Sequence, residues 1–319
     1  MRGAMVGARA GLVLVVGLLG GLSGCELAEI TIAEPDDIMV VEAYVRIGDG
    51  IDQVSAWVHW TMGTRSPEDL TDLTMRVVRE DGEDAFLLLR PDNLCLRRGL
   101  GADVEGACYA AEVDIEGFFD PGSQADLEIV TGEGEVTRGV SEIPGNMELI
   151  RPEARGRCAL APGDTLLFEW NRSPGVWAYS AETEVMDLKD ALAAEGIVVE
   201  TDSVALRGLA VSDADTTVAF PQEFGILERF DLEQEVALAL QRGLPRGATA
   251  NVVIAAVDRN YVNWVRGGNF NPSGFVRVSS LQGEAVGVFG SMVRRNIEVK
   301  GGAPGDFPGE SISNCVPGG

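Results

Sequence analysis

Histidine and lysine are almost absent from this chain of 319 residues, which has one histidine, His59, and two lysines, Lys189 and Lys300. A single histidine excludes most histidine-based metal sites and any proteolytic site that needs a second histidine. The 50 acidic residues outnumber the 25 basic ones and give a net charge of -25. This charge argues against nucleic acid as a partner, because phosphate contacts need lysine and arginine surfaces. An anionic membrane surface would repel the chain for the same reason.

Catalytic motifs are also lacking. The sequence contains no GxSxG, P-loop, HExxH or CxxC motif, and no GxGxxG on a strand-to-helix turn. Aspartate and glutamate are so abundant that no carboxylate pair for glycoside hydrolysis can be singled out. We therefore expect a protein without enzymatic activity and without a cofactor.

The first 25 residues have the pattern of an export signal. Arg2 and Arg9 flank the start of a short apolar run at residues 12–19, which is too short to span a bilayer as a helix. The run leads to LSGC at residues 22–25. This motif resembles a bacterial lipobox, in which small residues precede the cysteine that receives the lipid.

The lipobox resemblance implies that residues 1–24 are a lipoprotein signal peptide and that Cys25 becomes the lipidated first residue. Several acyl chains on one residue anchor a protein stably, where one chain would be marginal. Residues 25–37 then form an acidic tether to the membrane. Glu26 stands where aspartate would signal retention in the inner membrane, so we expect the outer membrane of a bacterial cell envelope. An ordinary secretory signal followed by a chance cysteine is the alternative.

Four cysteines remain after Cys25, and an even number in an exported chain suggests disulfides with three alternative pairings. We favour Cys95–Cys108, which would close a glycine-rich segment and contribute about 3 kcal/mol. The complementary pair, Cys158–Cys315, would tie the C-terminal tail to the second domain and contribute about 5 kcal/mol. Four free buried thiols are the alternative. The spacings fit no zinc finger.

The rest of the chain alternates between apolar and polar residues with the period of β-strands. Hydrophobic residues make up 45% and charged residues 24% of the sequence, as in folded globular proteins. Strands are expected at residues 39–45, 53–60, 73–79, 85–89, 107–115, 125–131 and 136–141, with a short helical turn after Ser66. This spacing predicts an antiparallel β-sandwich over residues 38–150.

A second antiparallel β-sandwich is expected over residues 151–300, followed by a loose Gly/Pro-rich tail at 301–319. Its strands are expected at residues 164–170, 176–180, 204–211, 216–220, 249–257, 286–289 and 292–299. Residues 187–195 predict a short helix, with Gly196 as its C-terminal cap. Residues 236–240 fit strand or helix, and we favour strand. Asp258 is expected to cap a helical turn that carries Tyr261 and Trp264 on one face.

The second domain resembles a fibronectin type III module, and the fold class we expect is all-β with two Ig-like or fibronectin III-like sandwiches. LFEW at 167–170, SPG at 173–175 and VWAY at 176–179 resemble the second and third strands of that module. LPRGATA at 244–250 and the following residues 252–258 resemble its later strands.

Residues 38–295 also resemble an uncharacterised family of bacterial outer-membrane lipoproteins. The shared features are VVEAY at 40–44, CY at 108–109, IPG at 143–145 and QGEAVGVFGS at 282–291. Members of this family are often encoded beside TonB-dependent outer-membrane receptors. The resemblance therefore implies such a receptor as a partner, and it supplies no catalytic residues.

Few side chains stand out as ligand-binding candidates. Asp213 and Asp215 form a D-x-D in a predicted turn, where their oxygens are a weak candidate site for Ca²⁺. A solvated acidic turn is the commoner role of such a pair. His59 should share a strand face with Trp57 and Ser55, which favours a structural role over that of a catalytic base. Five aromatic residues offer either core packing or a sugar-stacking platform: Trp57, Trp60, Trp177, Tyr261 and Trp264.

These observations favour a non-enzymatic binding or accessory module held at the envelope by a lipid on Cys25. A surface glycan-binding protein or a carbohydrate-active enzyme is the alternative. The ligand is not specified by the sequence.

Overall fold

The computed structural model describes residues 37–48, 51–62, 64–95, 104–111, 117–153, 156–200, 202–209, 213–224, 234–266 and 277–316. The predicted signal peptide, Cys25 and the tether up to residue 36 lie outside the described residues. No helix within these ranges is long and apolar enough to cross a membrane.

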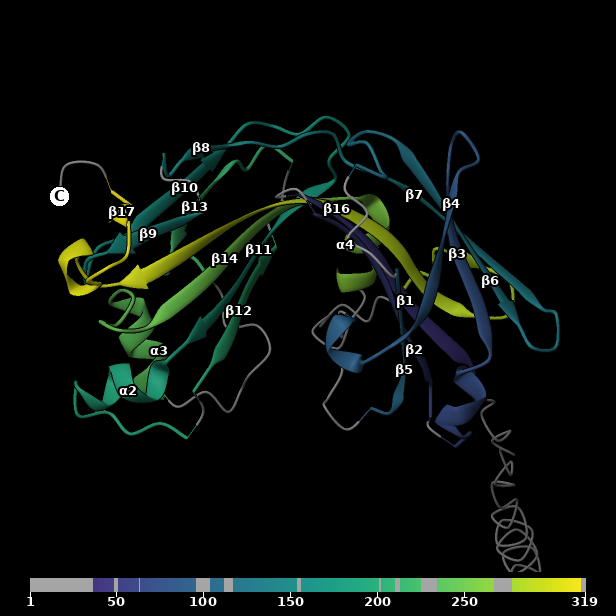
Figure 1. The fold of residues 1–319 in the computed structure, drawn as a ribbon, viewed down its shortest axis with the longest axis horizontal. Coiled ribbons are helices and arrows are strands. Elements are labelled where there is room, and N and C mark those ends of the chain that lie inside the picture. The colour runs from purple at the N-terminus through teal and green to yellow at the C-terminus, as the bar shows by residue number, and fades with distance from the viewer. Residues whose placement is uncertain are drawn as a thin grey trace, which may run out of the picture. The chain divides into compact units, whose positions relative to one another are not determined.

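The predicted all-β class is confirmed, because most described elements are strands. Most of these strands join one large sheet, whose main path has the order β12-β11-β14-β16-β1-β2-β5-β4-β3-β6-β7-β15, with β9 and β17 added beside β16. Antiparallel pairs predominate (Figure 1). The strands before residue 150 are β1 (Met39–Gly48), β2 (Ile51–Trp60), β3 (Leu73–Arg79), β4 (Asp84–Arg90), β5 (Gly106–Ala111), β6 (Gln124–Thr131), β7 (Val136–Glu142) and β8, which starts at Leu149.

Local sequence signals account for much of this first half. The strands predicted at residues 73–79 and 85–89 are present as β3 and β4, and they form a hairpin around the turn at residues 80–83. Ser66 caps the 3-10 helix η2 (Pro67–Leu70): its side chain accepts a hydrogen bond from the Glu68 amide, and proline occupies the first helical position. A second 3-10 helix, η3 (Asp92–Leu94), precedes Cys95. The part of the predicted strand 107–115 beyond Ala111 lies outside the described residues.

The second half adds a smaller sheet to the large one. The three strands β13 (Thr217–Phe220), β10 (Leu166–Trp170) and β8 (Leu149–Arg151) form it in that order. The remaining strands are β9 (Arg157–Leu160), β11 (Ala178–Met186), β12 (Val204–Leu209), β14 (Thr249–Val257), β15 (Leu281–Gln282), β16 (Val286–Gly301) and β17 (Ser313–Asn314). The predicted strands 286–289 and 292–299 are therefore one continuous strand.

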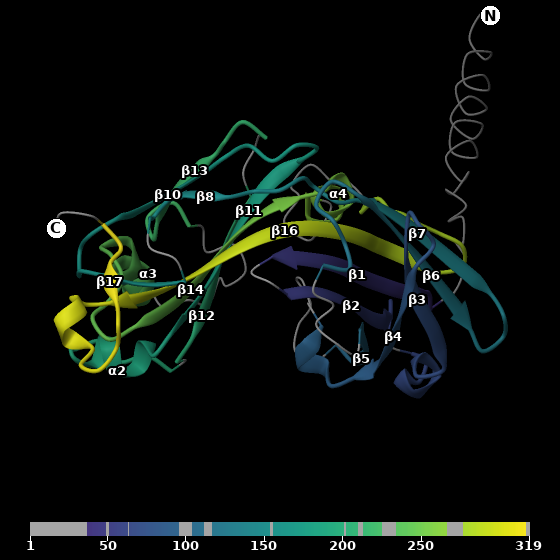
Figure 2. The same cartoon turned by 45° about the horizontal axis from the view of Figure 1, so that its top comes forward.

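Strand β16 connects the two halves of the large sheet (Figures 1 and 2). Its first part pairs in parallel with β1, for example Glu42 with Val288. Its last part pairs antiparallel with β14, for example Ile254 with Arg295. The two predicted domains thus share a strand, and the boundary at residue 150 stays a prediction.

Along the chain, two short helices lie between strands of the second half. The predicted short helix is present as α2 (Leu188–Ala193), and Gly196 behind it has a φ of 80°. The strand prediction for 236–240 is wrong, because α3 (Gln234–Gln241) is a helix. Val236, Ala239 and Leu240 are buried while Leu238 is half exposed, which is the i, i+3, i+4 spacing of a helix face.

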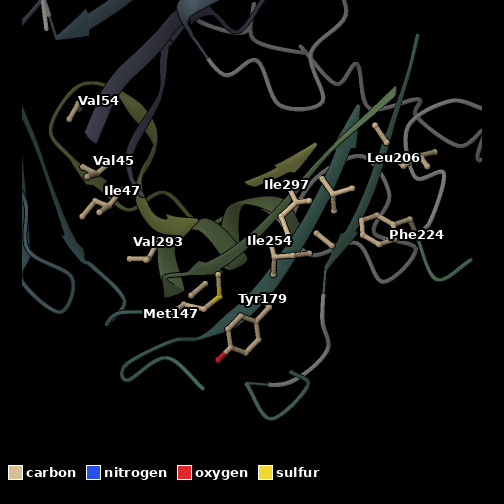
Figure 3. Close-up of a cluster of buried hydrophobic side chains, with 14 of the residues drawn as sticks. Val45, Ile47, Val54, Met147, Tyr179, Leu206, Phe224, Ile254, Val293 and Ile297 are labelled. Atoms are coloured by element: carbon tan, nitrogen blue, oxygen red, sulfur yellow. The ribbon is translucent and has the colours of Figure 1, made fainter. Parts of the chain in front are cut away.

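One continuous apolar core underlies both halves. Figure 3 shows part of it, with Val45, Ile47 and Val54 near Val293, and Ile254 and Ile297 further along. The smaller sheet packs its buried face onto the same core, and Trp170 meets Tyr179 edge to face with ring centroids 5.2 Å apart. Trp170 is therefore a core residue.

Both favoured disulfides are present. Cys95 bonds Cys108 and Cys158 bonds Cys315, with Cα atoms 5.7 and 4.9 Å apart.

The expectation of a loose tail is wrong for the described residues up to 316. Strand β17 pairs in parallel with β9, the short helix η4 (Pro304–Asp306) follows β16, and Glu310 forms ion pairs with Arg157 and Lys300. The glycines and prolines of the tail obscured these contacts, which join segments far apart in the sequence.

Candidate functional site

Helix α4 (Arg259–Arg266) forms hydrogen bonds with several buried polar side chains. As predicted, Asp258 caps it: the Tyr261 amide donates to Asp258 Oδ1 at 2.8 Å. Tyr261, Val262 and Trp264 are buried against the face of β1 and β16 that lies opposite the main core. Figures 1 and 2 both show α4 beside the middle of β16. The apolar side of this amphipathic helix therefore covers the second face of the sheet.

The Asp258 carboxylate joins three elements. Ser141 Oγ on β7 lies 2.8 Å from Asp258 Oδ2 and 2.7 Å from Ser291 Oγ on β16. Asn260 continues the seam, since its Nδ2 donates to the carbonyls of Val140 and Phe289 at 2.7 and 2.9 Å. Strands β7 and β16 do not pair directly with each other. The Asn260 side chain links them by binding a backbone carbonyl of each.

Burial raises the pKa of Asp258 to about 6, and hydrogen bonds from the Tyr261 amide, the Ser141 hydroxyl and the Ser291 and Asn260 amides oppose this rise. Asp258 as a whole is only 3% exposed. Its position inside the seam, among donors from the protein itself, indicates a structural role.

A second carboxylate, Glu42 on β1, is fully buried. Trp264 Nε1 donates to Glu42 Oε1 at 3.0 Å, and the Arg277 guanidinium lies 3.5 Å from the same oxygen. Arg277 also stacks over the Trp264 ring at 4.8 Å. A buried carboxylate needs such partners, because an unpaired charge in the protein interior is strongly destabilising.

A third carboxylate, Glu182 on β11, accepts from the Tyr261 hydroxyl and from Ser180 Oγ, both at 3.2 Å. Tyr261 in turn meets Tyr44 edge to face at 6.0 Å. We name the set Glu42, Tyr44, Glu182, Tyr261, Trp264 and Arg277 the α4 cluster. Its two carboxylates are both engaged by protein donors, so the α4 cluster as described is a packing centre and presents no assembled catalytic group.

The sequence did not single out Glu42, Glu182 or Arg277. A signal was present for Glu42, because it is a charged residue within the otherwise apolar strand residues 39–45. Nothing local identified its partners, which lie more than 200 residues further along the chain.

The other predicted site residues are dispersed. His59 is buried on the same strand as buried Trp57 and Ser55, and its Nδ1 lies 3.0 Å from the Trp60 carbonyl oxygen. Asp213 forms an ion pair with Arg172, and Asp215 is exposed. Among the described residues, no group of three or more His, Cys, Asp or Glu side chains could hold a metal ion. The geometry therefore gives no support to the weak calcium candidate at Asp213 and Asp215.

The aromatic residues do not form a sugar-stacking platform. Trp57, Tyr261 and Trp264 are at most 5% exposed, and only Trp177 among the five is largely accessible, with 48% exposure. Arg259 stacks over its ring at 5.3 Å. The platform fails because the strand and helix faces that carry these residues turn inward.

A polar clamp holds the start of the described chain. The Asp37 carboxylate accepts hydrogen bonds from the amides of Met62, Thr64 and Arg65 at 2.9, 2.8 and 3.0 Å. Desolvation raises its pKa, but these bonds and one from the Thr64 hydroxyl outweigh that effect and hold the pKa well below its ordinary value. The clamp fixes the first described residue to the turn that follows β2.

Comparison with known proteins finds only distant structural similarity. The sequence matches no protein-family model and no curated protein. Similar solved structures include the fibronectin(III)-like modules of Clostridium thermocellum CbhA, at 7% identity and TM-score 0.20, over 83% of this chain and 94% of theirs. DIP-gamma IG1+IG2 is similar at 10% identity and TM-score 0.20, over 84% and 98% of the two chains. A DUF4785 family protein from Legionella pneumophila shares 9% identity at TM-score 0.20, over 67% and 51%.

Proposed function

We propose that this protein is a lipid-anchored lipoprotein of the bacterial cell envelope that acts as a non-enzymatic binding module. One observation carries the proposal: the four cysteines after Cys25 are all consumed in two disulfides. These two disulfides leave Cys25 as the remaining cysteine of the chain, and it stands at the end of the lipobox-like motif. Disulfides are also typical of proteins in oxidising compartments outside the cytoplasm.

The carboxylates around α4 have structural partners within the chain. Glu42, Glu182 and Asp258 are all committed to holding α4 against the sheet. Rigid β-sandwiches commonly present loops to a partner. The resemblance to outer-membrane lipoproteins suggests that this partner is a TonB-dependent receptor.

The anchor is tested by Cys25→Ser, expressed in a bacterial host with a lipoprotein pathway. We expect the variant to lose lipid labelling and to leave the membrane fraction. Glu26→Gln is the matched control and should keep both properties. Lipid labelling that persists in Cys25→Ser would contradict the proposal.

The partner is tested by crosslinking the lipidated protein in native envelopes, followed by mass spectrometry. Only two lysines, Lys189 and Lys300, are present, and Lys300 is already paired with Glu310. A photoactivated crosslinker is therefore preferable to an amine-reactive one. We expect one outer-membrane receptor in near-stoichiometric yield, whereas the absence of a reproducible partner would count against the accessory role.

A further inference from the structure

Apolar side chains are exposed at the point where the described chain begins. Ile38 and Met62 are 40% and 54% exposed. Trp60 lies beside them, partly buried against the core, and the Arg65 guanidinium carbon is 4.7 Å from the centre of its ring. We name these four residues, Ile38, Trp60, Met62 and Arg65, the Trp60 end.

The Trp60 end is held in place by hydrogen bonds. Ile38 and Thr61 exchange bonds through the Ile38 amide and carbonyl, at 3.0 Å each. The Asp37 carboxylate accepts from the backbone of the turn that carries Met62 and Arg65. Trp60 Nε1 donates to the Ser66 carbonyl at 3.1 Å. The exposed apolar atoms therefore belong to a built surface.

The covalent chain ties this surface to the membrane if Cys25 carries a lipid, so the inference rests on the proposed function. Asp37 follows Cys25 by 12 residues. A chain of that length reaches at most roughly 40 Å when fully extended. Ile38 follows Asp37 directly, so the Trp60 end stays within about this distance of the bilayer surface.

The chemistry of the Trp60 end suits a lipid headgroup region. Tryptophan concentrates at membrane interfaces, and arginine extends its aliphatic stem over apolar surface while its charge stays in water. Glu68, Asp69 and Asp72 are exposed nearby on η2 and after it. These acidic groups oppose binding to anionic lipid, so the contact depends on the apolar side chains and suits a zwitterionic surface.

We propose that the Trp60 end lies in the headgroup region of the membrane leaflet that holds the lipid on Cys25, where it orients the sandwich on the bilayer. Lipid attachment alone would fix the chain to the membrane only at Cys25. Insertion of Ile38, Trp60 and Met62 would add a second contact on the folded part of the chain.

The test uses lipidated protein in phosphatidylcholine vesicles whose acyl chains carry bromine near the headgroup. Bromine quenches tryptophan on contact, and Trp60 is one of five tryptophans, so we expect up to about one-fifth of the emission to be lost relative to unbrominated vesicles. Trp60→Phe should abolish this loss. Trp177→Phe is the matched control, because Trp177 is also accessible and also stacks with an arginine. It should retain the quenching, which becomes up to about one-quarter of the emission of its four remaining tryptophans.

Met62→Glu provides a second variant, since Trp60 also packs against the core and its replacement could disturb folding. It retains the tryptophan, places a charge on the exposed surface and should remove the quenching. Equal quenching in wild type, Trp60→Phe and Met62→Glu, or no quenching of lipidated protein, would overturn the inference and leave the proposed function standing. A chain without lipid mass on Cys25 would overturn both.

Discussion

Asp258 makes the stability of this protein depend on pH in an unusual direction for an aspartate. Burial raises its pKa from the ordinary 3.8 to about 6 in the folded state. The folded protein then binds more protons than the unfolded chain between these two values, so its stability decreases as pH rises from about 4 to about 6. A difference of roughly 2 pKa units corresponds to about 3 kcal/mol.

Asp258→Asn isolates this contribution. The amide has nearly the shape of the protonated carboxyl, and its oxygen can still accept from the Tyr261 amide to cap α4. Ser141 Oγ can accept from the new NH₂ group and donate to Ser291 Oγ. We therefore expect the free energy of unfolding of the variant, minus that of the wild type, to increase by about 3 kcal/mol between pH 4 and pH 7.

Urea unfolding followed by tryptophan fluorescence at pH 4, 5, 6 and 7 measures this difference, with the disulfides kept intact. Taking the difference between the two proteins removes the contributions of the other acidic residues. Asp215→Asn, at an exposed position, is the control and should alter stability by less than about 0.5 kcal/mol at every pH. Parallel pH curves for Asp258→Asn and wild type would refute the assignment.

Two further predictions concern the disulfides and the α4 cluster. Replacing both cysteines of the 158–315 bridge by serine should lower the free energy of unfolding by about 5 kcal/mol, and replacing both of the 95–108 bridge should lower it by about 3 kcal/mol. The difference arises because the sequence separations are 157 and 13 residues. Thermal and urea unfolding of the two variants measures both effects, and the reverse order would contradict this account. Trp264→Phe removes the donor to buried Glu42 and should destabilise the fold by about 1–3 kcal/mol, whereas Trp177→Phe at an accessible position should change it by less than about 0.5 kcal/mol. Equal effects of these two tryptophan substitutions in urea unfolding would argue against a structural role for the Trp264–Glu42 bond.

Features set by neighbouring residues could be predicted from the sequence. The alternation of residues 73–79 and 85–89 around a glycine turn gave the β3–β4 hairpin, because both strands meet through a short connection. Asp258 was identified as a helix cap for the same reason: the cap and the amide it binds are three residues apart.

Apart from the Cys158–Cys315 disulfide, features that depend on distant segments could not be predicted. Glu42 reads as one polar residue in an apolar strand, and its burial depends on Trp264 and Arg277. The parallel pairing of β1 with β16 joins residues about 246 positions apart, such as Val40 and Val286, and strand alternation carries no information about which strand is the neighbour. The helix α3 was missed because an alternation of large and small apolar residues fits either period over five residues.

The choice between core packing and a sugar-stacking platform could not be made from the sequence for a related reason. Alternation states which residues share a face, but it does not state whether a second layer covers that face. Trp57 and His59 were placed on a common face, and that face is buried. The aromatic residues considered for sugar binding are therefore mostly part of the interior.

The central claim is that the mature protein begins at a lipidated Cys25. The most direct measurement is the mass of the intact protein extracted from the membrane fraction of the native or a related host, together with that of its N-terminal peptide. The account predicts a chain of residues 25–319 that carries the acyl groups on Cys25 and retains both disulfides. A chain cleaved at another position, or one with an unmodified Cys25, would contradict it.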